Sequence, residues 1–255
     1  MKTVVVTMNS FRIDEVQKYG QGEFINLIAK AGAKGAEIRR ELFVDQTLPL
    51  KELGDQIKAA QLFSIFSAPV ELYNKAGNLD EKSIKLIVLE AVTLGSKIVK
   101  FSLGHYTSER SNVHNLKKLL HSLEIEKHNL QVTIENDQTM HGGNLERISQ
   151  FLKETAKHDV PVKMTFDIGN WLYTGEKVWS AAKRLSPYVI YVHCKHVERF
   201  GNELVTLPLP VAESADWRKL IALFADGSPY AIEFPLRGED LMETTKQYTL
   251  LLANT

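Results

Sequence analysis

Residues 163–170 read KMTFDIGN, a short run that alternates polar and apolar residues, closes on Asp167 and is followed by a glycine. This pattern is typical of a β-strand with one buried face. Similar runs recur along the chain, and each is followed by a stretch with the period of an amphipathic helix. The alternation predicts a parallel sheet with helical crossovers.

The number of such runs decides between the possible parallel architectures. Eight strand and helix pairs close a barrel, and 255 residues is a usual length for that fold. We therefore predict an α/β protein, a single (β/α)8 TIM barrel formed by one domain over residues 1–255. The expected strands are Thr3–Met8, Ala36–Arg39, Phe63–Ser67, Ile98–Ser102, Val132–Glu135, Lys163–Asp167, Val189–His193 and Tyr230–Glu233.

An open doubly wound sheet would produce the same alternation. Its nucleotide-binding form carries a glycine-rich phosphate loop after the first strand, where this chain reads MNSFRID at residues 8–14. This absence favours the barrel. We expect one long irregular stretch at residues 194–215, with Pro208 and Pro210, and its length is typical of a lid or a binding loop.

Composition excludes several classes of function. Lys plus Arg and Asp plus Glu both total 31, so the net charge is zero and we expect neither nucleic acid nor a membrane surface as a partner. Cys194 is the only cysteine, which rules out an intrachain disulfide and predicts a cytoplasmic protein. The apolar run at the N-terminus is too short for a secretory signal, and we interpret it as the first strand.

The polar residues that close the expected strands are the main candidates for chemistry. Strand five ends at Glu135, strand six at Asp167, strand seven at His193 and strand eight at Glu233. Active sites of this fold lie at the C-terminal ends of the strands, so these four side chains should meet there. Their sequence neighbours on the opposite strand face are apolar, as a barrel wall covered by helices requires.

Three carboxylates around one imidazole indicate a metal site. Like charges at close range raise one another's pKa and oppose folding unless a cation neutralises them. Three oxygen donors and one nitrogen donor favour a fairly hard divalent ion. We expect Mn2+ first, with Mg2+, Co2+ or Zn2+ as the alternatives; for any single acidic residue, capping of the next helix is the competing interpretation.

Two lysines share the inward parity of the strand-end residues. Lys100 lies in IVKFSLG and would point into the barrel, where an unpaired cation is unusual, so we expect a substrate or carboxylate partner. Lys195 follows His193 by two residues and could reach a substrate oxygen, or it could extend to solvent. Both are candidate substrate-binding residues.

At these residues the chain resembles the xylose isomerase-like TIM barrel superfamily, and within it the sugar phosphate isomerase/epimerase family. The texts that carry the resemblance are IEN after Glu135, FDIGN at Asp167, YVHCK at His193 and GAEIRRE at Glu37. In the epimerase and isomerase branch, a Glu, an Asp, a His and a Glu on strands five to eight bind one metal. The resemblance implies that Glu135, Asp167, His193 and Glu233 do the same here.

Substrate contacts follow the family pattern only in part. The epimerases carry a His three residues after the strand-six Asp, where this chain has Asn170, and a Glu six residues after the strand-five Glu, where it has His141. The Arg six residues after the metal-binding His is kept as Arg199. The resemblance implies substrate-binding roles at these three positions and, by analogy with relatives, a homodimer or homotetramer.

The resemblance implies a metal-dependent sugar isomerase or epimerase that acts on a small ketose or related polyol through an enediolate. Glu135 and Glu233 would be the catalytic acid and base, and Asp167 and His193 would be ligands only. An inosose-type dehydratase on the same site is an alternative. An endonuclease IV-like DNA repair enzyme is another, although neutral net charge and few His residues at the strand ends count against it, and a noncatalytic sugar-binding barrel is the least favoured.

Overall fold

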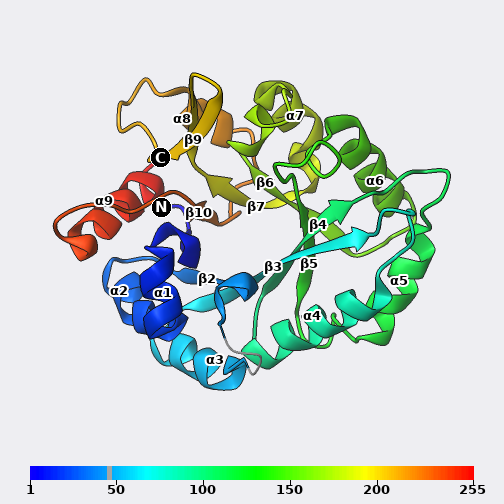
Figure 1. Ribbon diagram of the computed structural model, residues 1–255, viewed down its shortest axis with the longest axis horizontal. Helices are drawn as coiled ribbons and strands as arrows, with labels where there is room; N and C mark the ends of the chain where they lie inside the picture. Colours follow the sequence, from blue (N-terminus) through cyan, green and yellow to red (C-terminus); the bar gives the residue numbers. More distant parts are fainter. Residues whose placement is uncertain (45–47) are drawn as a thin grey trace.

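The computed structural model describes residues 1–44 and 48–255, and within them eight parallel strands close into a barrel (Figure 1). Their order around the barrel is β1-β10-β7-β6-β5-β4-β3-β2, so neighbours in sequence are neighbours in space apart from an inserted hairpin. This confirms the predicted (β/α)8 architecture. The barrel strands are β1 Val4–Thr7, β2 Gly35–Arg39, β3 Phe63–Tyr73, β4 Ile98–Gly104, β5 Gln131–Glu135, β6 Val162–Asp167, β7 Val189–Cys194 and β10 Tyr230–Ile232.

Helices surround the barrel and cover the outer face of the sheet (Figure 1). No helix in the described part of the chain combines the length and the apolar character needed to cross a membrane. Short 3-10 helices occupy Met8–Ser10, Gln21–Phe24, Arg40–Leu42, Asn170–Leu172 and Ser186–Tyr188. The α-helices are α1 Ile13–Tyr19, α2 Ile25–Lys30, α3 Leu50–Ala59, α4 Glu81–Leu94, α5 Val113–Ser122, α6 Leu145–Lys157, α7 Val178–Leu185, α8 Asp216–Ile221 and α9 Leu241–Ala253.

Helix α4 shows how local sequence sets the ends of a covering helix. The Asp80 side chain accepts a hydrogen bond from the Ser83 backbone N–H at 3.2 Å, which caps the first turn. Gly95 ends the helix with a φ of 75°, a left-handed conformation that favours glycine. These boundaries match the helix expected from the sequence.

Two apolar clusters separate the inside of the barrel from the outside. The inner cluster is small and includes Tyr191 and Ala231, while the outer one fills the space between the sheet and the helices and includes Phe166 and Val192. Side chains therefore alternate along the strands as the sequence predicts. The inward residues near the strand ends are polar, and they gather at the mouth of the barrel.

Two segments differ from the sequence-based expectation. Strand β3 continues to Tyr73, well past Ser67, through a register shift between Ser67 and Glu71 that lets it follow an equally extended β4. Residues 194–215 are not irregular throughout, because β8 (His196–Phe200) and β9 (Glu203–Leu207) form an antiparallel hairpin. Both extensions rise from the C-terminal rim of the barrel.

Candidate metal centre

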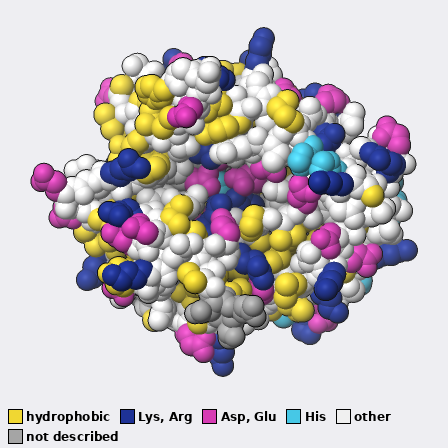
Figure 2. Space-filling model, in the orientation of Figure 1, with side chains coloured by type: hydrophobic (Ala, Val, Ile, Leu, Met, Phe, Trp, Pro, Cys, Tyr) yellow, Lys and Arg dark blue, Asp and Glu magenta, His cyan; other side chains and the backbone are white. Residues whose placement is uncertain are grey.

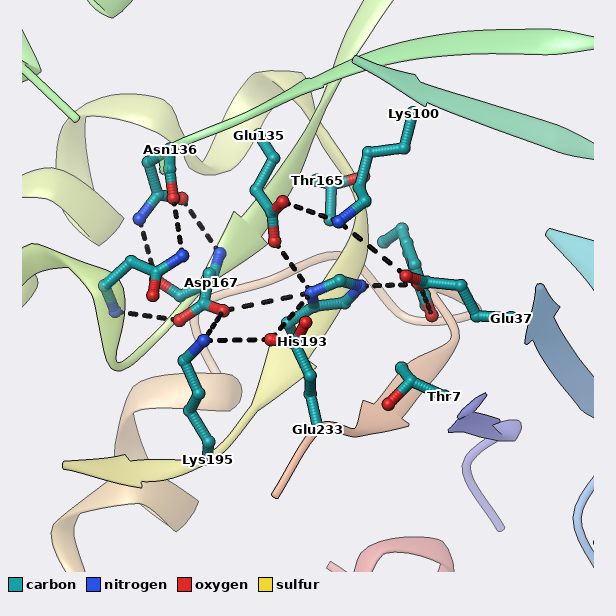
Figure 3. Close-up of polar contacts among 12 residues, drawn as sticks. Thr7, Glu37, Lys100, Glu135, Asn136, Thr165, Asp167, His193, Lys195 and Glu233 are labelled. Atoms are coloured by element: carbon teal, nitrogen blue, oxygen red, sulfur yellow. Dashed lines mark hydrogen bonds and ion pairs between the residues drawn. The ribbon is translucent and has the colours of Figure 1, made fainter. Parts of the chain in front are cut away.

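Four side chains converge at the C-terminal mouth of the barrel (Figure 3). Glu135 ends β5, Asp167 ends β6, His193 lies near the end of β7 and Glu233 follows β10. The His193 Nδ1 atom lies 2.8 Å from Glu135 Oε1, 3.1 Å from Glu233 Oε2 and 3.8 Å from Asp167 Oδ2. One donor atom from each residue can be chosen so that all four lie within 4.8 Å of one another. The structure thus brings together the four residues that the sequence selected.

Hydrogen bonds between strand ends fix the position of Asp167. Its Oδ1 atom accepts hydrogen bonds from the backbone N–H groups of Gly169 and Asn170, both at 2.8 Å. The Asn136 side chain donates to the Asp167 carbonyl at 3.0 Å and accepts from the Asp167 N–H at 2.9 Å. The IEN and FDIGN motifs therefore join β5 to β6, and they leave Asp167 Oδ2 directed at the other three residues.

Glu37 lies behind His193 and orients its ring. The fully buried Glu37 places Oε2 2.7 Å from His193 Nε2, and the same oxygen accepts a hydrogen bond from the Tyr191 hydroxyl at 2.7 Å. Arg39 donates to Glu37 Oε1 at 2.8 Å. Because Nε2 is engaged in this way, Nδ1 is the nitrogen that faces Glu135 and Glu233.

Three cations of the chain neutralise these carboxylates. Lys100 donates to Glu135 Oε2 at 2.5 Å, and Arg39 donates to Glu233 Oε1 at 3.1 Å. The Lys195 ammonium lies 2.7 Å from Asp167 Oδ2 and 2.9 Å from Glu233 Oε2. Repulsion among the carboxylates therefore does not by itself require a metal, which corrects the reason that the sequence suggested for one.

The donor atoms nevertheless fit a metal ion. Among the described residues, Glu135 Oε1, Asp167 Oδ2 and His193 Nδ1 are buried and have no hydrogen-bond partner of good geometry. Buried polar atoms in native structures are nearly always satisfied, so three that converge on one point need an explanation. A divalent cation held by three carboxylates and one imidazole would supply it. Lys195 already holds its positive charge against two of the same oxygens.

Burial and charge shift the pKa values of the four residues in different directions. Burial alone would raise the pKa of Glu135, but Lys100 and His193 outweigh it and lower the pKa to about 2. The pKa of Glu233 is likewise held well below its usual value against burial, chiefly by His193 and Lys195. Burial raises the pKa of Asp167 to about 7 despite the opposing charge of Lys195. Glu135 and Glu233 are thus the ionised pair that can accept a proton.

A cavity of about 440 Å³ opens above the four residues. Figure 2 shows acidic and basic side chains at the bottom of this hollow. Of the residues expected to bind substrate, three line it: Lys100, Asn170 and Lys195. The Asn170 amide is already engaged, since it donates to the Asn136 carbonyl at 2.9 Å and accepts from Gln138 at 3.2 Å.

The other two expected substrate-binding residues lie away from this cavity lining. His141 pairs with Glu71, with 2.8 Å between His141 Nε2 and Glu71 Oε1. Arg199 is exposed on the β8–β9 hairpin. The hairpin instead contributes Thr206 to the cavity.

Sequence reasoning missed the roles of Glu37 and Arg39. The signal was present in GAEIRRE, because Glu37 stands between Ala36 and Ile38 and shares the inward parity of the other site residues. Its partner His193 lies on a strand that is distant in sequence. The charge of Arg39 reaches Glu233, which is 194 residues away in the chain.

Comparisons with known proteins agree with this geometry. A profile of the family described as xylose isomerase-like TIM barrel matches residues 25–238. A comparison with curated protein sequences found no match. Many solved structures are similar.

Three of these structures cover nearly all of this chain and of their own. The probable 3-DHS dehydratase AsbF of Bacillus anthracis, involved in petrobactin synthesis, has a TM-score of 0.68 at 15% identity, with 100% of this chain and 99% of that chain covered. The IolI protein with a binding zinc atom gives 0.69 at 16%, with 100% and 99% covered. The D-psicose 3-epimerase of Clostridium cellulolyticum H10, solved with D-tagatose, gives 0.69 at 12%, with 100% and 98% covered. At these identities the likeness establishes the fold.

Proposed function

The chain belongs to the xylose isomerase-like TIM barrel family, and from that premise we propose that it is a divalent-metal-dependent isomerase or epimerase of a small ketose or related polyol. The observation that carries the proposal is the convergence of Glu135, Asp167, His193 and Glu233, with three buried donor atoms that lack good hydrogen bonds. The site lies at the barrel face that holds the active sites of this fold.

The same four residues would hold the metal ion. Mn2+ is the ion we propose, because three oxygen donors and one nitrogen donor suit a fairly hard cation; the zinc atom of the IolI protein makes Zn2+ the first alternative. When bound, the ion would act as a Lewis acid that polarises a substrate carbonyl and acidifies the neighbouring C–H. Glu37 would keep the His193 ring in the orientation that presents Nδ1.

Glu135 and Glu233 are the proposed acid and base. They come from β5 and from the residue after β10, and both line the cavity. Their lowered pKa values leave each ionised and able to take a proton from a bound substrate. Removal by one and return by the other to the opposite face of the same carbon would give epimerisation. Return at the neighbouring carbon would give aldose–ketose isomerisation.

A polar substrate fits the remaining lining of the cavity. Its volume of about 440 Å³ lies within the usual range for small-molecule sites, about 300–1,000 Å³. Lys100 and Lys195 present ammonium groups, and Asn9 and Ser67 present neutral polar ones. Hydroxyl groups of a sugar could exchange hydrogen bonds with each of them.

A dehydratase is the second candidate, and Lys195 is the observation that favours it. Its ammonium lies 2.9 Å from Glu233 Oε2, so a cationic acid stands beside the proposed base. Proton removal by Glu233, then protonation of a departing hydroxide by Lys195, would eliminate water. The two candidates share the first step, and they differ in whether the carbon is reprotonated or loses its neighbouring hydroxyl.

Solvent exchange tests the shared step for any product that the enzyme forms. We expect the Mn2+-loaded protein in D2O to place deuterium on the carbon beside the carbonyl of at least one ketose in a panel of ketohexoses, ketopentoses and inososes, monitored by proton NMR. Protein stripped of metal by a chelator should show no exchange, and added Mn2+ should restore it. Loss of a hydroxyl from the labelled product would identify the dehydratase; equal exchange with and without metal would contradict the proposal.

A further inference from the structure

A second group of metal-ligating side chains, Glu71, His105 and His141, lies beside the barrel mouth. We propose that these three residues bind another divalent ion, of the borderline-soft kind represented by Zn2+. They share no residue with the first group, and none of them is among the residues that line its cavity. Figure 2 shows His side chains gathered on the same face of the molecule, next to the central hollow.

The donor atoms of this group already lie close together. One ligand atom from each residue can be chosen so that all three lie within 4.8 Å of one another. His141 Nε2 is 2.8 Å from Glu71 Oε1, and the His105 and His141 rings stack with centroids 3.8 Å apart and planes 15° apart. All three side chains are partly exposed, so small rotations can aim them at one ion that enters from solvent.

Glu71 and His105 are positioned by the part of β3 and β4 that extends above the barrel. The register shift in β3 places Glu71 opposite Ser102, and Tyr73 pairs with Gly104. Gly104 has a φ of 71°, and a Cβ there would collide with the Tyr73 carbonyl oxygen and the Glu71 side chain. Glycine is therefore required where the strands approach, and the next residue, His105, is brought beside Glu71.

His141 is held in place by contacts within the loop between β5 and α6. Arg147 of α6 donates to the His141 carbonyl at 3.1 Å. Thr139 caps the same turn, because its hydroxyl accepts from Gly142 N–H at 2.9 Å and its carbonyl accepts from Gly143 N–H at 2.8 Å. The three ligands thus come from three separately anchored segments, and none is on a freely moving tail.

The donor set differs from that of the first group and so selects differently among metals. Two imidazole nitrogens and one carboxylate oxygen suit Zn2+, whereas Mg2+ and Ca2+ prefer oxygen ligands only. Three protein ligands leave a fourth position for water or another small ligand. We therefore infer a zinc-selective site next to a harder one.

A metal ion at this position would join two parts of the barrel rim. Glu71 and His105 belong to the β3–β4 extension, and His141 belongs to the loop that also carries Asp137 and Gln138. These last two residues line the cavity above the first group. An ion held by the second group would tie one wall of that cavity to the β3–β4 extension.

Zinc stoichiometry tests this inference through the difference between variants. We measure Zn2+ bound per chain by equilibrium dialysis at buffered free zinc, with elemental analysis of the protein. His141→Ala and Glu71→Gln should each bind one zinc equivalent fewer than the wild type. This difference holds whether the first group binds zinc or not, so failure of the proposed enzymatic function would leave it unchanged.

His158→Ala is the matched control. His158 and Glu154 form a similar surface pair, 2.9 Å apart with side-chain exposures of 27% and 40%, compared with 26% and 36% for His141 and Glu71. The control should bind as much zinc as the wild type. Wild-type stoichiometry in folded His141→Ala and Glu71→Gln, judged by circular dichroism, would overturn the inference. An equal loss in His158→Ala would do the same, because any exposed His–Glu pair would then explain it.

Discussion

Replacing Glu233 by Gln is expected to lower turnover by about 10²- to 10⁴-fold, the usual contribution of a general acid or base. The amide has nearly the same shape as the carboxylate but cannot take a proton from the substrate. Asn9 and Arg39, which donate to Glu233 Oε1 at 3.4 Å and 3.1 Å, can still donate to the amide oxygen. The fold should therefore persist while the chemistry fails.

The measurement is kcat on the substrate found by solvent exchange, with thermal melting to confirm folding. Glu90→Gln is the matched control, because Glu90 also pairs with an arginine, Arg40, but on the outer surface of the barrel. The control should keep wild-type turnover. A folded Glu233→Gln protein with undiminished turnover would refute the acid/base role of this residue.

Replacing Asp167 by Asn is expected to weaken Mn2+ binding by more than about 10- to 100-fold, the loss that changes behind the ligands already cause in metal sites. Asn can keep an oxygen in the place of Oδ1, where the Gly169 and Asn170 N–H groups donate. Its nitrogen would then replace Oδ2, one of the buried donors without a good hydrogen bond. The ligand charge is lost, and the turn after β6 is kept.

Titration of Mn2+ against the metal-free protein measures this loss directly. Asp137→Asn serves as its control, because Asp137 also lines the cavity but bonds to Thr139 within its own loop. The control should bind Mn2+ as the wild type does. Equal Mn2+ affinity in the wild type and in Asp167→Asn would remove Asp167 from the proposed ligands.

Much of the fold was predictable because a closed parallel barrel writes its pattern into every strand. All eight expected strands overlap observed ones, and the largest error is in β3, where the bulge after Ser67 interrupts the alternation. The β8–β9 hairpin was missed because its strands are mostly exposed and so lack an apolar face. The Gly201–Asn202 pair between them, with Gly201 at a φ of 60°, was the available signal for a tight turn.

The convergence of the four candidate ligands was also predictable, because the C-terminal ends of parallel barrel strands all meet at one rim. The balance of charge within the site was not. Lys100, Lys195 and Arg39 each pair with a carboxylate on another strand, and such pairs depend on side-chain reach inside the closed barrel. The pairing of His141 with Glu71 was hidden for the same reason, because it depends on the extension of β3.

Anomalous X-ray diffraction from crystals grown with Mn2+ tests most directly whether Glu135, Asp167, His193 and Glu233 share one cation. We predict a manganese peak bonded to all four side chains, with the Lys195 ammonium moved away from the oxygens of Asp167 and Glu233. The opposite result would be density without manganese among these residues at saturating Mn2+, with Lys195 still in contact with both carboxylates. The barrel would then hold a self-neutralised ion network at its mouth, and the metal-dependent chemistry proposed for it would be wrong.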